Sequence, residues 1–269
     1  MRFVDSLKRW LVWLLVASLF AVACVFLSQW QFSRRAEAVA KINLITQNYD
    51  QAPVALSELA SLKSFDAGNE WRPASITGNF LPEKAVLVRN RPYNGQPGFL
   101  QVVPFELATG EVIAVETGWL PTGSKQDSPD LLPLPDTQQR ELVIRLRAAE
   151  PTLGRDAPAH QLGTINVAEL VRREGLVGDV YLQVYGRATT SYNEDDLPKL
   201  LLKPELTEGN HLSYALQWIL FALMAFGALW WAIRQELEAK RKALDPTYKP
   251  KQRKKIGDDD KAAEDALLN

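Results

Sequence analysis

The chain has 269 residues, of which 46% are hydrophobic and 23% are charged, and its formal net charge is −1. This balance lacks the basic excess that marks nucleic-acid-binding proteins, so we expect no nucleic-acid partner. The single cysteine excludes an internal disulfide, and two histidines exclude a metal cage built from several histidines of one chain.

Two segments are long and apolar enough to cross a lipid bilayer. They cover residues 10–27 and 212–233, and neither contains a charged residue. As helices they would span about 27 and 33 Å, close to the roughly 30 Å of a hydrocarbon core. Six tryptophans bracket the two segments as an interfacial aromatic belt does: Trp10, Trp13, Trp30, Trp218, Trp230 and Trp231. We therefore expect two transmembrane helices.

The positive residues near the segment ends indicate an orientation. Three precede the first segment, and nine follow the second within residues 234–255. Because positive flanks stay in the cytoplasm, we expect residues 1–9 and 234–269 there and residues 28–211 outside. Arg34 and Arg35 oppose this orientation but are outnumbered. With no transit segment rich in arginine and serine, the expected location is a bacterial plasma membrane.

The first segment also permits a signal-peptide or lipoprotein interpretation. Small residues, Ala21-Val22-Ala23, precede Cys24 as they do at cleavage sites. Cleavage there would leave the apolar run Val25-Phe26-Leu27 at the new N-terminus. We therefore favour an uncleaved span in which Cys24 is a buried apolar cysteine.

The segment between the spans reads as a β-rich domain. The first helix should continue through residues 32–46, which contain neither proline nor glycine. Alternating or β-branched residues predict strands at 75–80, 85–91, 99–105, 111–119, 140–147 and 180–184. Asn166 should cap a short helix reaching Arg173, and four prolines within 121–136 indicate an exposed loop. The expected fold is an α+β membrane protein with an extracytoplasmic, antiparallel barrel- or sandwich-like domain. Residues 234–269 should form a charged, disordered tail.

Two motifs lie at the outer ends of the spans. His211, Tyr214, Ala215 and Trp218 form one helical stripe, with small residues below the imidazole that leave room for a flat ligand. An imidazole is also an iron ligand, but these residues alone favour an interfacial histidine among belt aromatics. Gln31 and Arg34 share a face beyond Trp30 and could meet a polar partner, although interfacial positions explain each of them separately.

The central motifs look structural. Arg91, Gly98, Gly118 and Trp119 lie at predicted turns and strand ends, where glycines serve turns or close backbone approach. His160 reads as a solvated surface residue, and Asp195-Asp196 and Asp258–Asp260 read as solvated acidic runs. The sequence shows no catalytic triad, phosphate loop or strong carboxylate pair, so we expect no enzyme.

Together these motifs resemble the Surfeit locus protein family over about residues 10–233. Four blocks occur in the family's order: Trp30-Gln31-x-x-Arg34; Thr77-Gly78-x-Phe80; Arg91…Pro97-Gly98-Phe99…Gly118-Trp119; and His211-x-x-Tyr214-Ala215-x-Gln217-Trp218. The chain departs from the family where Thr117 replaces the usual arginine before Gly118.

The resemblance implies a non-enzymatic assembly factor for haem-copper cytochrome c oxidase. Some bacterial members of the family bind haem a, so His211 becomes the candidate iron ligand. Tyr214, Ala215 and Trp218 would line the pocket, and Arg34 would meet the haem propionates. The expected partners are the oxidase catalytic subunit or its assembly intermediates, the lipid bilayer and, as a further candidate, haem a synthase. The alternative is a membrane protein that stabilises an oxidase intermediate without binding haem, and an enzyme ranks last.

Overall fold

The computed structural model describes residues 2–125, 127–154, 157–193, 197–245 and 247. The chain forms two compact units. Residues 1–37 and 209–269 make the helical unit, and residues 38–208 make the sheet unit. The sheet unit therefore begins ten residues later than the predicted outer domain, because the first helix continues beyond the apolar segment.

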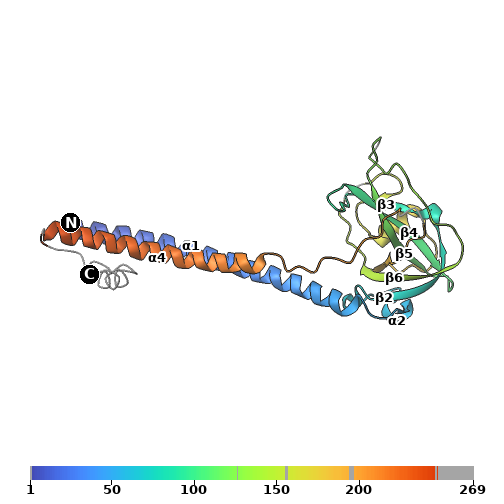
Figure 1. Cartoon of the computed structure of the whole chain (residues 1–269), viewed down its shortest axis with the longest axis horizontal. Helices are drawn as coiled ribbons and strands as arrows, with labels where there is room; N and C mark the ends of the chain where they lie inside the picture. Colours follow the sequence, from blue (N-terminus) through green and yellow to red (C-terminus); the bar gives the residue numbers. More distant parts are fainter. Residues whose placement is uncertain (1, 126, 155–156, 194–196, 246, 248–269) are drawn as a thin grey trace, which may run out of the picture. The chain divides into compact units, whose positions relative to one another are not determined.

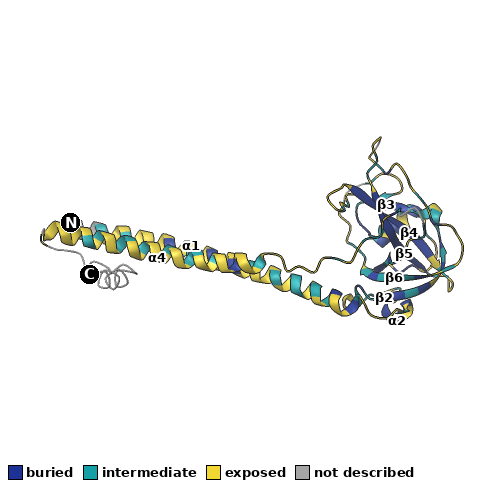
Figure 2. Ribbon diagram, in the orientation of Figure 1, coloured by how far each residue is buried: buried dark blue, intermediate teal, exposed yellow. Residues whose placement is uncertain are grey.

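The helical unit is built from α1 (Arg2–Asn48) and α4 (His211–Leu244). Neither proline nor glycine interrupts residues 2–48, and the predicted continuation of the first helix through residues 32–46 is confirmed. Both helices are long and apolar enough to cross a membrane. In Figure 2 their surfaces are mostly exposed, which suits helices that meet lipid rather than protein.

The predicted disordered tail needs a correction in its first part. Residues 234–244 continue α4 as helix. They contain no proline or glycine and are rich in strong helix formers. Glu236 also forms an i,i+4 ion pair with Lys240 at 2.7 Å. The rest of the tail prediction falls on residues 248–269, outside the described residues, and so does Asp195-Asp196.

α1 and α4 pack side by side in opposite directions (Figure 1). Near one end Glu236 accepts a hydrogen bond from Ser6 and pairs with Arg9 at 2.5 Å. Near the other end the Ser28 hydroxyl donates to the Ala215 carbonyl at 3.0 Å. Ser28 and Cys24 are buried on α1, and Ala215 is fully buried on α4. Small side chains at these positions let the two backbones approach closely.

The described residues of the sheet unit form eight strands and two short α-helices. The strands are β1 (Val54–Ala55), β2 (Pro73–Phe80), β3 (Val86–Val88), β4 (Gly98–Leu107), β5 (Val112–Pro121), β6 (Arg140–Ala148), β7 (Gln161–Leu162) and β8 (Val184–Ala188). The helices are α2 (Leu56–Leu59) and α3 (Val167–Glu174), and two 3₁₀ turns lie at Ala67–Asn69 and Pro82–Lys84. Asn166 caps α3 as predicted, accepting from the Glu169 amide at 2.8 Å.

Strand pairing closes five of these strands into a ring. β2 pairs with β6, β6 with β8, β8 with β5, β5 with β4, and β4 again with β2. Of the two predicted alternatives, the barrel is therefore the one that forms. Closure leaves the five strands with few unpaired edges.

The prediction of a purely antiparallel sheet is wrong for three pairs. β8 runs parallel to β5, β1 parallel to β2, and β3 parallel to β7. β8 also starts at Val184, where the predicted strand ends, and Val180 makes only an isolated bridge. A parallel neighbour requires a long crossover connection. For β5 and β8 the chain between them supplies it and includes β6 and α3.

The central strands β4 and β5 are buried on both faces. Val103 and Ile113 belong to one apolar cluster, whereas Val102 and Ala114 belong to the other. The second cluster also contains Leu170 of α3, which covers that side of the sheet. A sheet covered on both faces produces strands that are nearly continuous in apolar residues.

Candidate functional site

The motif after the first apolar segment and the motif that opens the second meet through their side chains. His211 begins α4, and its Nδ1 lies 2.9 Å from Gln31 Oε1 on α1. The residues are 180 positions apart in the chain. One turn further along each helix, the bond from Ser28 to Ala215 joins the same two segments. Packing of the helices therefore places the family's two flanking motifs at one site.

The contact with Gln31 determines which nitrogen of His211 has a lone pair. An amide oxygen can only accept, so Nδ1 carries the hydrogen when the imidazole is neutral. Nε2 then presents its lone pair away from Gln31. Metal-binding histidines are oriented in this way, with the second ring nitrogen donating to a polar group. Among the described residues, no three His, Cys, Asp or Glu side chains gather as a metal site.

Space next to Nε2 is provided by a glycine. Gly209 precedes α4 with a φ of +65°. A Cβ built on this residue would lie 3.6 Å from His211 Nε2, in van der Waals contact. Glycine therefore leaves no side-chain atom of residue 209 beside this side of the imidazole. A single histidine offers one axial bond to a haem iron.

The sequence predicts that a flat ligand lies over the small side chain of Ala215, and the structure contradicts this. This residue is fully buried against α1 and presents no surface to a ring. Tyr214 is half exposed, and Trp218 is partly exposed with its ring packed edge-on against Phe221. The Ala215 face of the stripe therefore packs the two helices together, and the exposed aromatic surface lies to its sides.

Arg34 does not meet α4. Its guanidinium pairs with Glu37 on the same helix at 2.9 Å and lies over the ring of Trp30, 5.9 Å from the centroid. Its side chain is exposed, so an anion from outside the helix has access to it. Of the two predicted polar residues on this face, the structure therefore brings Gln31 but not Arg34 to the second helix.

The central motif residues come together in the sheet unit. The Trp119 indole donates to the Arg91 carbonyl at 2.6 Å, and its ring is almost fully buried. At Gly98 a Cβ would lie 2.4 Å from the Trp119 ring and 2.4 Å from the Leu120 carbonyl oxygen. Gly118, with a φ of +146°, allows the Lys199 carbonyl to approach within 2.7 Å of its missing Cβ. These contacts lie within the sheet unit, and a structural role for the four residues stays a prediction.

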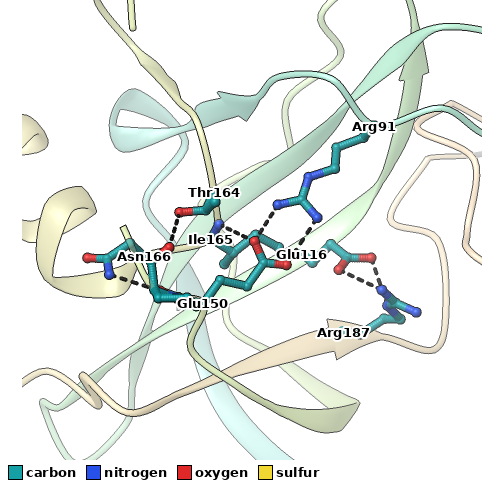
Figure 3. A network of polar contacts seen from close by, with 8 residues as sticks. Arg91, Glu116, Glu150, Thr164, Ile165, Asn166 and Arg187 are labelled. Atoms are coloured by element: carbon teal, nitrogen blue, oxygen red, sulfur yellow. Dashed lines mark hydrogen bonds and ion pairs between the residues drawn. The ribbon is translucent and has the colours of Figure 1, made fainter. Parts of the chain in front are cut away.

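The Arg91 side chain takes part in a network of polar contacts (Figure 3). Its guanidinium makes two hydrogen bonds to the Glu150 carboxylate, which also accepts from the Ile165 amide at 2.9 Å. Burial disfavours the charged form of Glu150, but the bonds from Arg91 and Ile165 outweigh it, and the pKa of Glu150 is lowered. In the same view Glu116 pairs with Arg187 at 2.8 Å. These pairs connect β5 with β8 and the loop after β6 with the rest of the barrel.

Thr117, where the family usually has arginine, belongs to a buried network. Its hydroxyl donates to Gln101 Oε1 at 2.7 Å, and the Tyr192 hydroxyl donates to the same oxygen at 2.7 Å. Burial raises the pKa of Tyr192, so this group remains a donor at neutral pH. A neutral threonine thus satisfies the interior position without the cost of burying a charge.

Sequence reasoning missed three residues that support these sites. Ser28 lies three residues before Gln31 and so on the same helical face, which is a detectable signal. Gly209 precedes a helix start, which is an ordinary place for glycine. Glu150 gives no local signal, because its partner Arg91 is 59 residues away. His160 is largely exposed, as predicted, and its Nδ1 lies 2.9 Å from Glu174.

Comparison with known proteins decides the family. The SURF1 family model matches residues 18–223, which include all four motif blocks. The chain belongs to the SURF1 family. This is the Surfeit locus family predicted from the motifs, and it is linked to cytochrome oxidase assembly. SURF1-like proteins of Mycobacterium bovis and Mycobacterium tuberculosis, each named as uncharacterised, are 28% identical to this chain over 244 residues. The alignment covers 87% of this chain and 86% of each relative.

Proposed function

We propose that this SURF1-family chain is a membrane-anchored, non-enzymatic assembly factor for cytochrome c oxidase, and that it carries haem a. The hydrogen bond between His211 and Gln31 supports this proposal most directly. It links the two flanking family motifs in one place and leaves one imidazole nitrogen as a metal ligand. Haem a is the cargo in this proposal, and its iron would take His211 Nε2 as an axial ligand.

A single protein ligand suits a carrier. Two histidine ligands would hold a haem tightly, whereas one axial bond leaves the cargo easier to release. Because Ala215 is buried, the macrocycle would lie beside the helix pair and not over the Ala215 face. The exposed rings of Tyr214 and Trp30 offer apolar surface there. Arg34 would bind a propionate in exchange for its contact with Glu37, since a guanidinium binds carboxylates bidentately.

The proposed topology has both helices crossing a bacterial plasma membrane, with both termini cytoplasmic. The nine positive residues within 234–255 support this orientation. Reporter fusions at Gln138 and Asn269 should report opposite sides of the membrane. Signals from the same side, or a mature N-terminus near Cys24, would contradict the topology.

A second candidate function is an interaction protein that stabilises an oxidase intermediate without haem. The bond to Gln31 also supports this function, because it would equally fix His211 as a structural contact between helices. The two candidates differ in what occupies Nε2.

Haem content of the purified full-length protein separates the two candidates. We expect a haem spectrum that is lost or strongly shifted in His211→Ala and unchanged in His160→Ala, the matched control at the second histidine. Gly209→Ala should weaken haem retention, because its methyl group would contact Nε2. Equal haem content in all four proteins would establish the alternative. Deletion of the gene should lower oxidase activity and membrane haem a under either candidate, and normal oxidase in the deletion strain would overturn both.

A further inference from the structure

The loop between β5 and β6 exposes three leucines, whereas two of its prolines are buried. Leu131, Leu132 and Leu134 are 66%, 48% and 45% exposed, whereas Pro129 and Pro135 are buried. Leucine normally occupies the interior in preference to proline. Residues 131–136 contain neither helix nor strand. Burial of prolines with exposure of leucines is the opposite of the preference that these residue types usually show. Three large apolar side chains exposed within four residues are a candidate interaction site.

Polar contacts hold this loop in place on both sides of the leucines. The Pro133 carbonyl accepts from Gln101 Nε2 at 2.7 Å and lies 2.7 Å from the Tyr192 hydroxyl, whose one hydrogen it shares with Gln101 Oε1. Asp130 accepts from the Ser124 amide at 3.0 Å, and the Thr137 carbonyl accepts from Asn79 at 2.8 Å. Prolines further restrict the backbone. The leucines are therefore presented by a fixed segment, which lowers the entropy lost when a partner binds.

The charge of the loop bears on whether its partner is a lipid surface or a protein. Residues 128–139 contain two aspartates and no lysine or arginine. Asp136 pairs with Arg140, and the Asp130 carboxylate lies next to Leu131 and is exposed. Apolar segments that enter membranes are flanked by basic residues that bind anionic headgroups. An acidic flank disfavours a lipid surface and favours a protein with positive charge beside an apolar groove.

We propose that the segment 128–137, here called the leucine loop, docks into an apolar groove of another protein, with Lys or Arg at the rim of the groove beside Asp130. Recognition would resemble that of other proline-rich segments, whose restricted backbone binds apolar grooves at low entropic cost. The proposal goes beyond haem binding and does not depend on it.

Photo-crosslinking tests this surface in the full-length chain in its native membrane. A photoreactive residue replaces Leu132, and the control carries it at Val177, which is 90% exposed in the sheet unit. We expect a protein adduct from position 132 whose cross-linked peptide, mapped by mass spectrometry, is apolar with Lys or Arg close by. Added salt and Asp130→Asn, which keeps an acceptor oxygen, should both lower the yield.

Three results would overturn the proposal: adducts with lipid, adducts with a second copy of this chain, or the same adducts from position 177. Replacement of all three leucines by serine should weaken partner binding by roughly tenfold or more, because each buried leucine contributes that order of affinity. The same variant should keep its thermal unfolding and its haem content, because the leucines are exposed. Unchanged partner binding in this correctly folded variant would equally exclude the loop as the docking surface.

Discussion

His211 and Gln31 are hydrogen-bonded across two helices, with 2.9 Å between Nδ1 and Oε1. Each residue belongs to a different family motif, at opposite ends of the matched region. The bond gives Gln31 a specific role, because it sets both the orientation of the imidazole and the nitrogen that stays available to a ligand.

The tautomer of His211 should depend on Gln31. In a His160→Gln background His211 is the only histidine, so nitrogen-15 NMR of labelled imidazole reports on it alone. We expect the hydrogen on Nδ1 in the parent protein. Gln31→Leu removes the acceptor and should shift the population toward Nε2–H, whereas Gln29→Leu, at an exposed neighbouring position, should not. Identical nitrogen shifts in the two leucine variants would refute the assigned role.

Packing of the two helices should be sensitive to the size of residue 28. Ser28 is buried and donates to the Ala215 carbonyl, so Ser28→Leu must push the helices apart. Overpacking of this kind costs about 1–3 kcal/mol, and about 1.4 kcal/mol corresponds to a tenfold change in an equilibrium. Cys24, the single cysteine and 1% exposed, provides the readout. We expect roughly tenfold faster maleimide labelling of Cys24 in detergent for Ser28→Leu. Val25→Leu, at an exposed position, should label at the parent rate.

The Arg91–Glu150 pair should make the stability of the barrel depend on pH. The folded protein holds the pKa of Glu150 below its usual 4.5. The ionised carboxylate therefore stabilises the fold above about pH 4.5, and this contribution is lost as pH falls through the lower folded pKa. Glu150→Gln should unfold more easily at pH 7, and its difference from the parent should shrink on acidification. Urea unfolding followed by tryptophan fluorescence measures both, with Glu106→Gln at an exposed position as the control. A difference that does not vary with pH would contradict the assigned ion pair.

Gly98 should tolerate no side chain. A Cβ there would lie 2.4 Å from both Trp119 and the Leu120 carbonyl oxygen, closer than real Cβ contacts allow. Gly98→Ala should therefore destabilise the barrel by about 1–3 kcal/mol. Gly163→Ala is the matched control, since its Cβ would meet nothing within 4 Å. Equal thermal unfolding of the two variants would show that Gly98 is not required for packing.

Local chemistry along the chain determined the elements of this protein. Both long helices were predictable because each contains an uncharged apolar run of 18 residues or more, which is too long for a strand. Alternation and β-branching similarly located β2, β4, β5 and β6 to within a few residues. The helix at 167–174 followed from its Asn166 cap, since capping is a contact between residues three positions apart.

Contacts between distant residues were decided by the tertiary structure. Gln31 meets His211, Arg91 meets Glu150 and β8 enters beside β5 because burying apolar faces brings these segments together, and no local pattern encodes the partner. Ala215 was expected to lie under a haem ring, but the same packing buries it in the contact between the two helices. The sequence by itself determined where the long helices and main strands lie and which family motifs the chain carries. Only the fold decided which of them touch, because the free energy of burial depends on the whole chain.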